Sequence, residues 1–262
     1  MATMANPARE RMKKNEAALG PGIRHARHPE IAGAMKTAGF DFLFIDLEHS
    51  AMPLDVCSQI SAAAIQAGIA PLVRVPEGDH NLATRALDTG ALGIIMPHVE
   101  SAAEARTIVA RQKYPPIGQR SVAGPMPQFS YAALPLREAT DAANESLLVV
   151  VMVETENGVA HADEIAAVPG VDVLMIGTSD LTASMGIPGQ FEHERVVKAY
   201  DTVIEACARH GKWPGMGGVG TEDAMARYIG RGMRFVLAGN DINFLMAAAA
   251  SRAKALRGKE AP

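Results

Sequence analysis

The chain has 262 residues, 48% of them hydrophobic and 21% charged, with a formal net charge of −4. This length can form one large hydrophobic core, and the slightly acidic balance excludes the basic face expected of a nucleic-acid-binding protein. No run reaches the ~18 uncharged apolar residues that span a bilayer, and the polar segment 1–20 lacks the apolar centre of a secretory signal. We therefore expect a soluble, cytoplasmic protein in which Cys57 and Cys207 remain reduced.

Short apolar strands alternate with amphipathic helices along the first half of the chain. The strands are expected at 18–23, 42–46, 71–75 and 93–96, and the helices at 53–67, 82–89 and 101–113. Ser101 and Glu104 have the spacing of a helix capping box. The segment 114–146 is rich in proline and glycine and is too long for an ordinary connection. We expect it to lie over the carboxyl ends of the strands, where the active-site loops of barrels are found.

The second half of the chain continues the same alternation. Strands are expected at 147–153, 171–177, 214–217 and 235–238, and helices at 193–210, after Thr221 and at 242–256. Eight strand–helix units in this length predict an α/β fold, a (β/α)8 TIM barrel, with a doubly wound sheet as the competing architecture. We assign the whole chain, 1–262, to this single domain, with a polar N-terminal extension at about 1–16.

Two acidic residues, Glu154 and Asp180, follow two successive long apolar runs. Because the carboxyl ends of parallel strands meet at one edge of a sheet, both carboxylates are expected at the same end of the barrel. Two convergent carboxylates repel each other unless a cation joins them, so the pair predicts a divalent metal site. The alternative is that Asp180 or Thr182 simply caps the next helix.

Other ionisable residues also lie at or near strand ends. Asp46 ends a predicted strand, and Glu48 and His49 follow it directly, either as a polar loop or as acid–base groups. Arg74 lies between two valines inside an apolar strand. Its guanidinium stays charged and needs a carboxylate partner, which comes either from a ligand or from Glu154, Asp46 or Glu48.

Three further patterns bear on the chemistry. Gly177, Thr178 and Ser179 place backbone amides where they can approach an anion. The G-x-G-x-x-G spacing at 215–220 is not a dinucleotide fingerprint, because it follows six strand–helix units instead of opening the fold. His98 is expected to be a hydrogen-bonded wall residue. No lysine falls in a predicted strand, which favours a metal over a Schiff base as the electron sink.

Taken together, the motifs resemble the HpcH/HpaI aldolase family over about residues 31–250. The resemblance is carried by five segments, 41–49, 71–74, 114–120, 153–155 and 176–181. It implies a (β/α)8 barrel of the phosphoenolpyruvate/pyruvate type. It also implies metal-dependent cleavage of a 4-hydroxy-2-oxoacid to pyruvate, or a related 2-oxoacid, and an aldehyde.

The resemblance implies a role for each matching residue. Glu154 and Asp180 would bind the divalent metal, for which oxygen ligands suit Mg²⁺, Mn²⁺ or Co²⁺. Arg74 would hold the pyruvate carboxylate or its enolate oxygen. His49 would act near a water on the metal as part of the acid–base machinery, and Asp46 would orient that water.

Further implications concern the substrate pocket and the assembly. Backbone groups of Gly177, Thr178 and Ser179 would line the oxoacid site. The resemblance also implies an obligate oligomer, commonly a hexamer. In such an assembly, Asp88 would pair with the histidine of a neighbouring subunit. Two departures concern the pocket: Met152 stands where the family often has glutamine, and segment 22–27 lacks the family's aromatic residue.

Two other functions compete with this interpretation. The first is a citrate-lyase β-like acyl-CoA lyase, which needs a basic groove for phosphates. Four cations of the expected mouth loop could supply one, namely Arg111, Lys113, Arg120 and Arg137. The second is a non-catalytic barrel that binds an oxoacid. The presence of Glu154, Asp180, Arg74 and His49 argues against that second alternative.

Overall fold

The structure, a computed structural model, describes residues 4–257 and contains a closed barrel of eight parallel strands. The strands are β1 (Ala18–Ile23), β2 (Phe42–Asp46), β3 (Ala70–Arg74), β4 (Gly93–Met96), β5 (Leu148–Val153), β6 (Val173–Gly177), β7 (Trp213–Gly217) and β8 (Phe235–Asn240). They follow one another in chain order, and β1 pairs with both β2 and β8. The (β/α)8 prediction is confirmed, and the doubly wound alternative is wrong.

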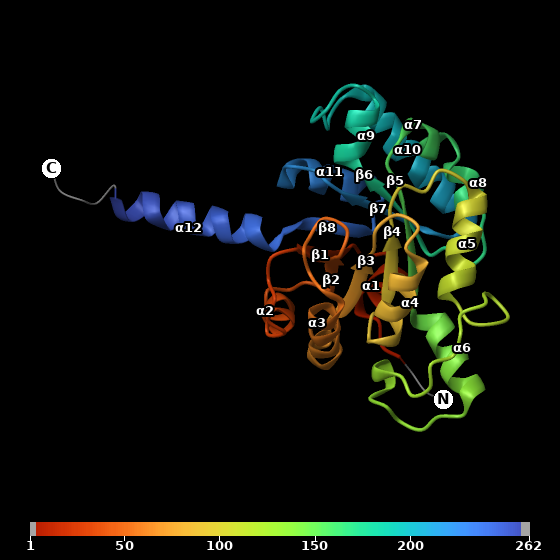
Figure 1. Ribbon diagram of the computed structural model, residues 1–262. Coiled ribbons are helices and arrows are strands. Elements are labelled where there is room, and N and C mark those ends of the chain that lie inside the picture. Colours follow the sequence, from red (N-terminus) through yellow and green to blue (C-terminus); the bar gives the residue numbers. More distant parts are fainter. Residues whose placement is uncertain (1–3, 258–262) are drawn as a thin grey trace.

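Helices surround this barrel and connect its strands (Figure 1). They are α1 (Pro7–Lys13), α2 (Ile31–Thr37), α3 (Leu54–Ala67), α4 (His80–Asp88), α5 (Ala102–Gln112), α6 (Leu136–Ser146), α7 (Glu156–Ala160), α8 (Ala162–Ala166), α9 (Thr178–Ser184), α10 (Glu194–His210), α11 (Glu222–Arg231) and α12 (Asp241–Arg257). The capping box of Ser101 and Glu104 and the cap at Thr221 are confirmed. No described helix is long and apolar enough to cross a membrane.

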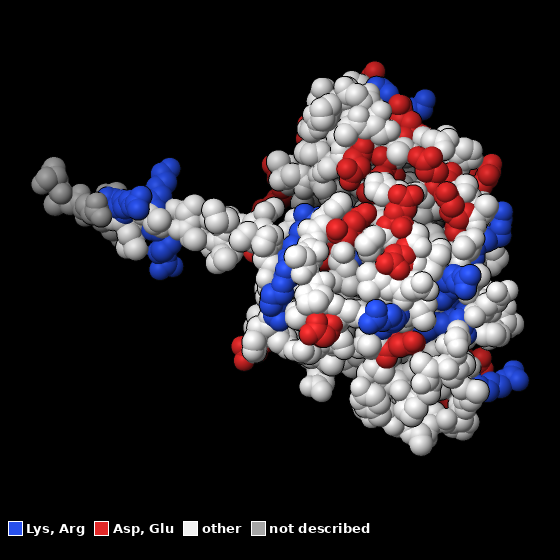
Figure 2. All heavy atoms as spheres, viewed as in Figure 1, with Lys and Arg blue, Asp and Glu red and all other residues white. Residues whose placement is uncertain are grey.

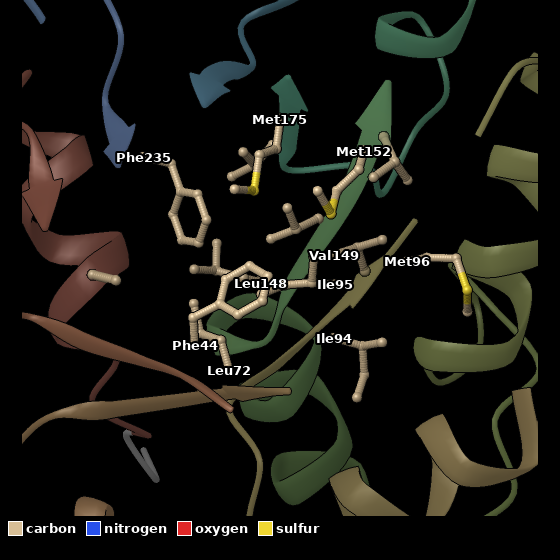
Figure 3. Close-up of a cluster of buried hydrophobic side chains, with 14 of the residues drawn as sticks. Phe44, Leu72, Ile94, Ile95, Met96, Leu148, Val149, Met152, Met175 and Phe235 are labelled. Carbon is tan, nitrogen blue, oxygen red and sulfur yellow. The ribbon is translucent and has the colours of Figure 1, made fainter. Parts of the chain in front are cut away.

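The strands form because their aliphatic residues are buried on both faces. Every residue of β2 to β6 is buried, as expected of parallel strands between a barrel interior and a layer of helices. Figure 3 shows Phe44, Met175 and Phe235 turned toward the barrel interior, with Ile94 and Met96 on the side of the helices. Side chains therefore fill the barrel interior below the strand ends.

The N-terminal segment, expected as a polar extension, forms a helix that packs beneath the barrel. The Asn6 side chain donates to the carbonyls of Leu92 and Ser146, at 3.1 and 2.8 Å. Arg9 forms a 2.5 Å ion pair with Asp172. These contacts tie α1 to the amino ends of β4 to β6 and close the lower end of the barrel.

The segment between α5 and α6 lies at the opposite end from that expected. Gln128 of this segment donates to the carbonyls of Leu87 and Ala91, which precede β4. Figure 1 shows the segment at the bottom, near the N-terminus, while β4 and β5 point upward. The reason is topological: α5 carries the chain back from the carboxyl end of β4, so the residues after α5 lie at the amino ends. The prediction that segment 114–146 lies over the carboxyl ends of the strands is therefore wrong.

Most of the last helix does not pack on the body of its own chain, although near its base the Phe244 ring stacks on that of Phe40, with centroids 6.1 Å apart. In Figure 1, α12 leaves the end of β8 and projects away from the body. None of its residues is buried, although Phe244, Leu245, Met246 and Leu256 are large and apolar. A cavity of about 440 Å³ lies between its base and α2, lined in part by Ile31. This part of the outer wall lacks the helical cover that the other strands have.

Candidate active site

A cavity of about 230 Å³ opens at the carboxyl ends of the strands. Its polar wall contains residues at or after the ends of β1, β2, β3, β5 and β6, namely Arg24, His49, Arg74, Glu154, Thr178, Ser179 and Asp180. Its apolar lining consists of Phe44, Met152, Met175 and Leu237. Alternation along the strands produces this layering, because every second side chain of each strand points into the barrel.

Glu154 and Asp180 line this cavity together, as their strand-end positions indicate. Glu154 is 2% exposed, and its Oε2 accepts a 2.8 Å hydrogen bond from the backbone N–H of His98. Burial raises the pKa of Glu154, and the charge of Asp180 raises it further, against the opposing effects of His98 and Arg74. A cation between the two carboxylates would offset both the burial and the repulsion, so the donor set fits a divalent metal.

The protein supplies few ligands beyond these two carboxylates. Within residues 4–257 there is no cluster of three or more His, Cys, Asp or Glu residues arranged to hold an ion. A metal held by Glu154 and Asp180 would therefore take its remaining ligands from water and substrate. This is the open coordination that a catalytic ion needs.

Gly177 provides the space in which the Glu154 carboxylate lies. A Cβ atom built on Gly177 would overlap the Glu154 side chain. The residue is therefore a glycine because another side chain approaches its backbone closely, and its φ of −87° requires no special conformation. The same glycine ends β6 and starts α9, whose first turn carries Asp180.

Arg74 forms ion pairs with two carboxylates while it also lines the cavity. Its Nε and Nη2 donate to Oδ1 and Oδ2 of Asp46, at 3.0 and 2.6 Å. Its Nη1 lies 3.0 Å from Oε2 of Glu48. The sequence left open whether Arg74 meets protein carboxylates or a ligand, and the structure shows the protein pairs directly.

Asp46 is fully buried, and its carboxylate accepts hydrogen bonds from two arginines and two backbone N–H groups. Besides those from Arg74, it accepts one from Nε of Arg24 at 2.6 Å and one from each backbone N–H of Glu48 and His49, both at 3.1 Å. Burial alone would raise the pKa of Asp46, but the hydrogen bonds and charge of Arg74, the N–H of His49 and the charge of Arg24 lower it overall. Asp46 therefore stays ionised and fixes the groups around it.

Two histidines flank Glu48 at the cavity rim. Nε2 of His49 lies 3.6 Å from Oε2 of Glu48, and the His49 side chain is 52% exposed. Nε2 of His98 lies 3.8 Å from Oε1 of Glu48, and its Nδ1 lies 3.3 Å from Oε2 of Glu154. His98 has a left-handed backbone, with φ +53°, which is uncommon for a residue other than glycine. His98 is hydrogen-bonded to Glu154, as the sequence predicted, but it is not among the residues that line the cavity.

The hydroxyls of Thr178 and Ser179 hold α9 against β7. Thr178 donates to the carbonyl of Gly217 at 2.7 Å, and Ser179 donates to that of Gly218 at 3.4 Å. Gly218 has a positive φ of 78°, and a Cβ there would meet Ser179. The glycine-rich segment 215–220 therefore brings the β7 loop close to the cavity.

Asp88 is not at the cavity of its own chain. It is the last residue of α4, which ends near the amino end of β4, and it accepts a 2.6 Å hydrogen bond from Nη2 of Arg120. The Arg120 guanidinium also lies 4.7 Å from the ring centroid of Tyr114. Any role of Asp88 in chemistry would therefore require a second copy of the chain.

Sequence reasoning missed Arg24 as a site residue. Arg24 directly follows β1, as Asp46 ends β2, and strand-end position was the signal that could have identified it. Three neighbouring charged or titratable residues, His25, Arg27 and His28, made the segment resemble an ordinary polar loop.

Comparison with known proteins assigns the chain to one family. Residues 25–248 match the HpcH/HpaI aldolase/citrate lyase family. The chain is 41% identical to a 4-hydroxy-4-methyl-2-oxoglutarate aldolase from Hapsidospora irregularis, over 86% of this chain and 84% of that protein. A 4-hydroxy-4-methyl-2-oxoglutarate aldolase from Chaetomium globosum is 37% identical, over 90% of this chain and 89% of that protein. The crystal structure of an HpcH/HpaI aldolase from Desulfitobacterium hafniense DCB-2 is 30% identical, with a TM-score of 0.92 over 98% of each chain.

Proposed function

Since the chain belongs to the HpcH/HpaI aldolase/citrate lyase family and is a pyruvate-releasing aldolase, we propose that the cavity at its strand ends cleaves a branched 4-hydroxy-2-oxodiacid. The observation that supports this site most strongly is the convergence of Glu154, Asp180 and Arg74 on one small cavity. The proposed substrate, 4-hydroxy-4-methyl-2-oxoglutarate, is the one named for two of the relatives. In that case the carbonyl product is a second 2-oxoacid instead of an aldehyde.

We further propose that Glu154 and Asp180 hold a divalent cation, with Mg²⁺, Mn²⁺ or Co²⁺ suited to their hard oxygen ligands. When bound, such an ion would supply Lewis-acid stabilisation of the negative charge that develops on the substrate's keto oxygen. His98 supports this role, because its N–H fixes one oxygen of Glu154. Asp180, in the first turn of α9, is exposed and accessible to a ligand from the mouth.

The other residues would stabilise the enolate charge and accept the hydroxyl proton of a retro-aldol reaction. The bond between C3 and C4 breaks, its electron pair passes to the C2–C3 unit as an enolate, and the 4-hydroxyl loses its proton. Arg74 would bind the oxoacid carboxylate or enolate oxygen with a guanidinium that Asp46 already orients. His49 would accept the hydroxyl proton, and protonation of C3 would complete pyruvate.

We propose a different role for Asp46 from the expected one of orienting a water molecule. Its two oxygens accept five hydrogen bonds from Arg24, Arg74 and the backbone N–H groups of Glu48 and His49. We therefore assign Asp46 to positioning these neighbours instead of orienting a water molecule. The hydrogen bond from the His49 N–H to Asp46 fixes the backbone of the loop that carries the His49 imidazole.

The size of the cavity and the charges around the barrel argue against an acyl-CoA substrate. About 230 Å³ is less than the ~300–1,000 Å³ typical of pockets for larger ligands. Four cations were expected to form a phosphate groove, but they lie near the end of α5, just after it, or within α6, and therefore at or near the amino ends of the strands. One of them, Lys113, is buried and pairs with Asp172. A short substrate agrees better with this site.

The direct test is the stoichiometry of the reaction. Purified protein with Mg²⁺ or Mn²⁺ should release two pyruvate molecules from each molecule of 4-hydroxy-4-methyl-2-oxoglutarate. Coupled enzymatic detection of pyruvate measures this yield. Failure to release pyruvate from this acid or from a simpler 4-hydroxy-2-oxoacid would contradict the proposal.

His49→Gln is expected to lower kcat by about 10²- to 10⁴-fold, the range for loss of a general acid–base group. Metal affinity should be unchanged, because His49 contacts Glu48 and not Glu154. His25→Gln is the matched control, since His25 follows the neighbouring strand and its side chain is 63% exposed. Loss of metal binding in His49→Gln, measured by calorimetry, would contradict this division of roles.

We also propose that the protein is an oligomer, with a hexamer as the expected size. The exposed apolar face of α12 supports a second copy as the partner, since Phe244, Leu245 and Met246 are 39%, 64% and 61% exposed. Assembly would also allow Asp88 to approach a neighbouring site.

Sedimentation at micromolar concentration should show a species several times the 27.6 kDa chain mass. Leu245→Asp should dissociate it, because it places a charge in the proposed contact. Tyr131→Asp is the control, since Tyr131 is 68% exposed but lies between α5 and α6. A wild-type monomer, or unchanged assembly in Leu245→Asp, would contradict a contact through α12.

A further inference from the structure

We propose that Arg24 binds the carboxylate at the far end of the substrate and thereby selects diacids over acids with an uncharged tail. The inference rests on the proposed aldol cleavage and adds a specificity residue to it. It concerns the carboxylate that C4 carries, whereas Arg74 and the metal-binding carboxylates serve the C1–C2 end.

The topology places Arg24 across the cavity from Glu154. Arg24 follows β1 and Glu154 follows β5, and in the closed barrel these strands are four positions apart in either direction. Both residues line the same cavity. In this proposal, a substrate whose keto end lies beside Glu154 extends its C4 end toward the wall formed by β1.

The guanidinium of Arg24 is oriented but not saturated. Its Nε donates to Oδ2 of Asp46 at 2.6 Å, and Asp46 is fixed in turn by Arg74. Neither terminal nitrogen of Arg24 forms a hydrogen bond within the described residues, and the side chain remains 30% exposed. Four N–H donors are thus held at the cavity wall by a buried anchor, a geometry that suits bidentate binding of a carboxylate.

Asp46 does not need Arg24 to satisfy its own charge. Two hydrogen bonds from Arg74 and two from backbone N–H groups already reach its oxygens. A purely structural role for Arg24 therefore leaves unexplained why a second guanidinium borders the cavity. Recognition of an anion accounts for it.

Electrostatics also require a cation at this position. Glu154 and Asp180 line the cavity, and Figure 2 shows further Asp and Glu side chains gathered over the upper part of the molecule. The lysines and arginines that line the cavity, among the described residues, are Arg24 and Arg74. Arg74, which pairs with Asp46 and Glu48, is assigned to the C1–C2 end of the substrate. A second substrate carboxylate would therefore be repelled unless Arg24 received it.

The test compares two substrates that differ only at this carboxylate. One is 4-hydroxy-4-methyl-2-oxoglutarate, and the other is 4-hydroxy-4-methyl-2-oxopentanoate, in which a methyl group replaces it. Arg24→Gln should lower kcat/KM for the diacid by about 10- to 100-fold, the effect of losing a charged hydrogen-bonded partner. For the monoacid the change should stay below about threefold. Arg27→Gln is the control, because Arg27 lies in the same loop but does not line the cavity.

A binding measurement separates this inference from the proposed reaction. Calorimetry with 2-oxoglutarate and 2-oxopentanoate, with and without Mg²⁺, should show a preference for the diacid that Arg24→Gln removes. Equal losses for both substrates, or an unchanged binding preference in Arg24→Gln, would overturn the role of Arg24. If the wild type cleaves neither substrate but Arg24→Gln loses the binding preference, the proposed reaction fails and the carboxylate site stands.

Discussion

Glu154→Gln is expected to abolish pyruvate release, with a loss in kcat of at least about 10³-fold, because one of two proposed metal ligands loses its charge. Calorimetric titration with Mn²⁺ should show no saturable binding at the cavity. Removal of metal from the wild type by a chelator should have the same effect on turnover, and added Mg²⁺, Mn²⁺ or Co²⁺ should restore activity.

The same variant should be at least as stable as the wild type when both are free of metal at pH 7. Burial and Asp180 raise the pKa of Glu154 above that of an unfolded chain. The native state therefore favours the protonated form, and the stability contributed by Glu154 is lost as pH rises through its folded pKa. Glutamine removes this buried charge and can still accept the hydrogen bond from His98. Thermal melts at pH 5 and pH 7 should show that the advantage of Glu154→Gln grows with pH.

Glu156→Gln serves as the control for this experiment. Glu156 starts α7, just after Glu154, but it is 53% exposed and pairs with Arg195 at the surface. It should leave metal binding and turnover unchanged. Full activity of Glu154→Gln after exhaustive chelation would refute the metal site.

Arg74→Met is expected to lower kcat by about 10²- to 10³-fold, as for loss of a donor that stabilises an oxyanion. Affinity for pyruvate should fall in parallel, because the same guanidinium would bind the oxoacid. Arg74→Lys should recover little activity, since an ammonium cannot reproduce the fork that meets Asp46 and Glu48.

Arg74→Met should also destabilise the fold, by about 3 kcal/mol, because it leaves Asp46 buried with less compensation. The double variant Arg74→Met/Asp46→Asn removes both charges and should regain much of this stability without regaining activity. Thermal melts and pyruvate titrations separate the two effects. Normal pyruvate affinity in a folded Arg74→Met protein would show that Arg74 is only structural.

The order of the barrel could be predicted because the signals for it are local. Apolar runs such as 147–153 and the capping pattern at Ser101 depend on neighbours in the sequence, and both are present in the structure. Helices of five to seven residues, including α2, α7 and α8, are too short for hydrophobic periodicity to reveal. The segment 114–146 was placed at the wrong end because its composition was given more weight than its position after a helix.

The sequence by itself determined the fold class, the strand ends and, from those, the meeting of Glu154, Asp180, Arg74 and His49 at one cavity. It could do so because parallel strands place their carboxyl ends together whatever the details of packing. Only the tertiary structure decided how the charges pair: Arg74 with Asp46 and Glu48, Arg24 with the same Asp46, and Asp88 with Arg120 far from the cavity. The physical reason is that ion pairs depend on distances across the barrel, between residues far apart in sequence, which no local pattern encodes.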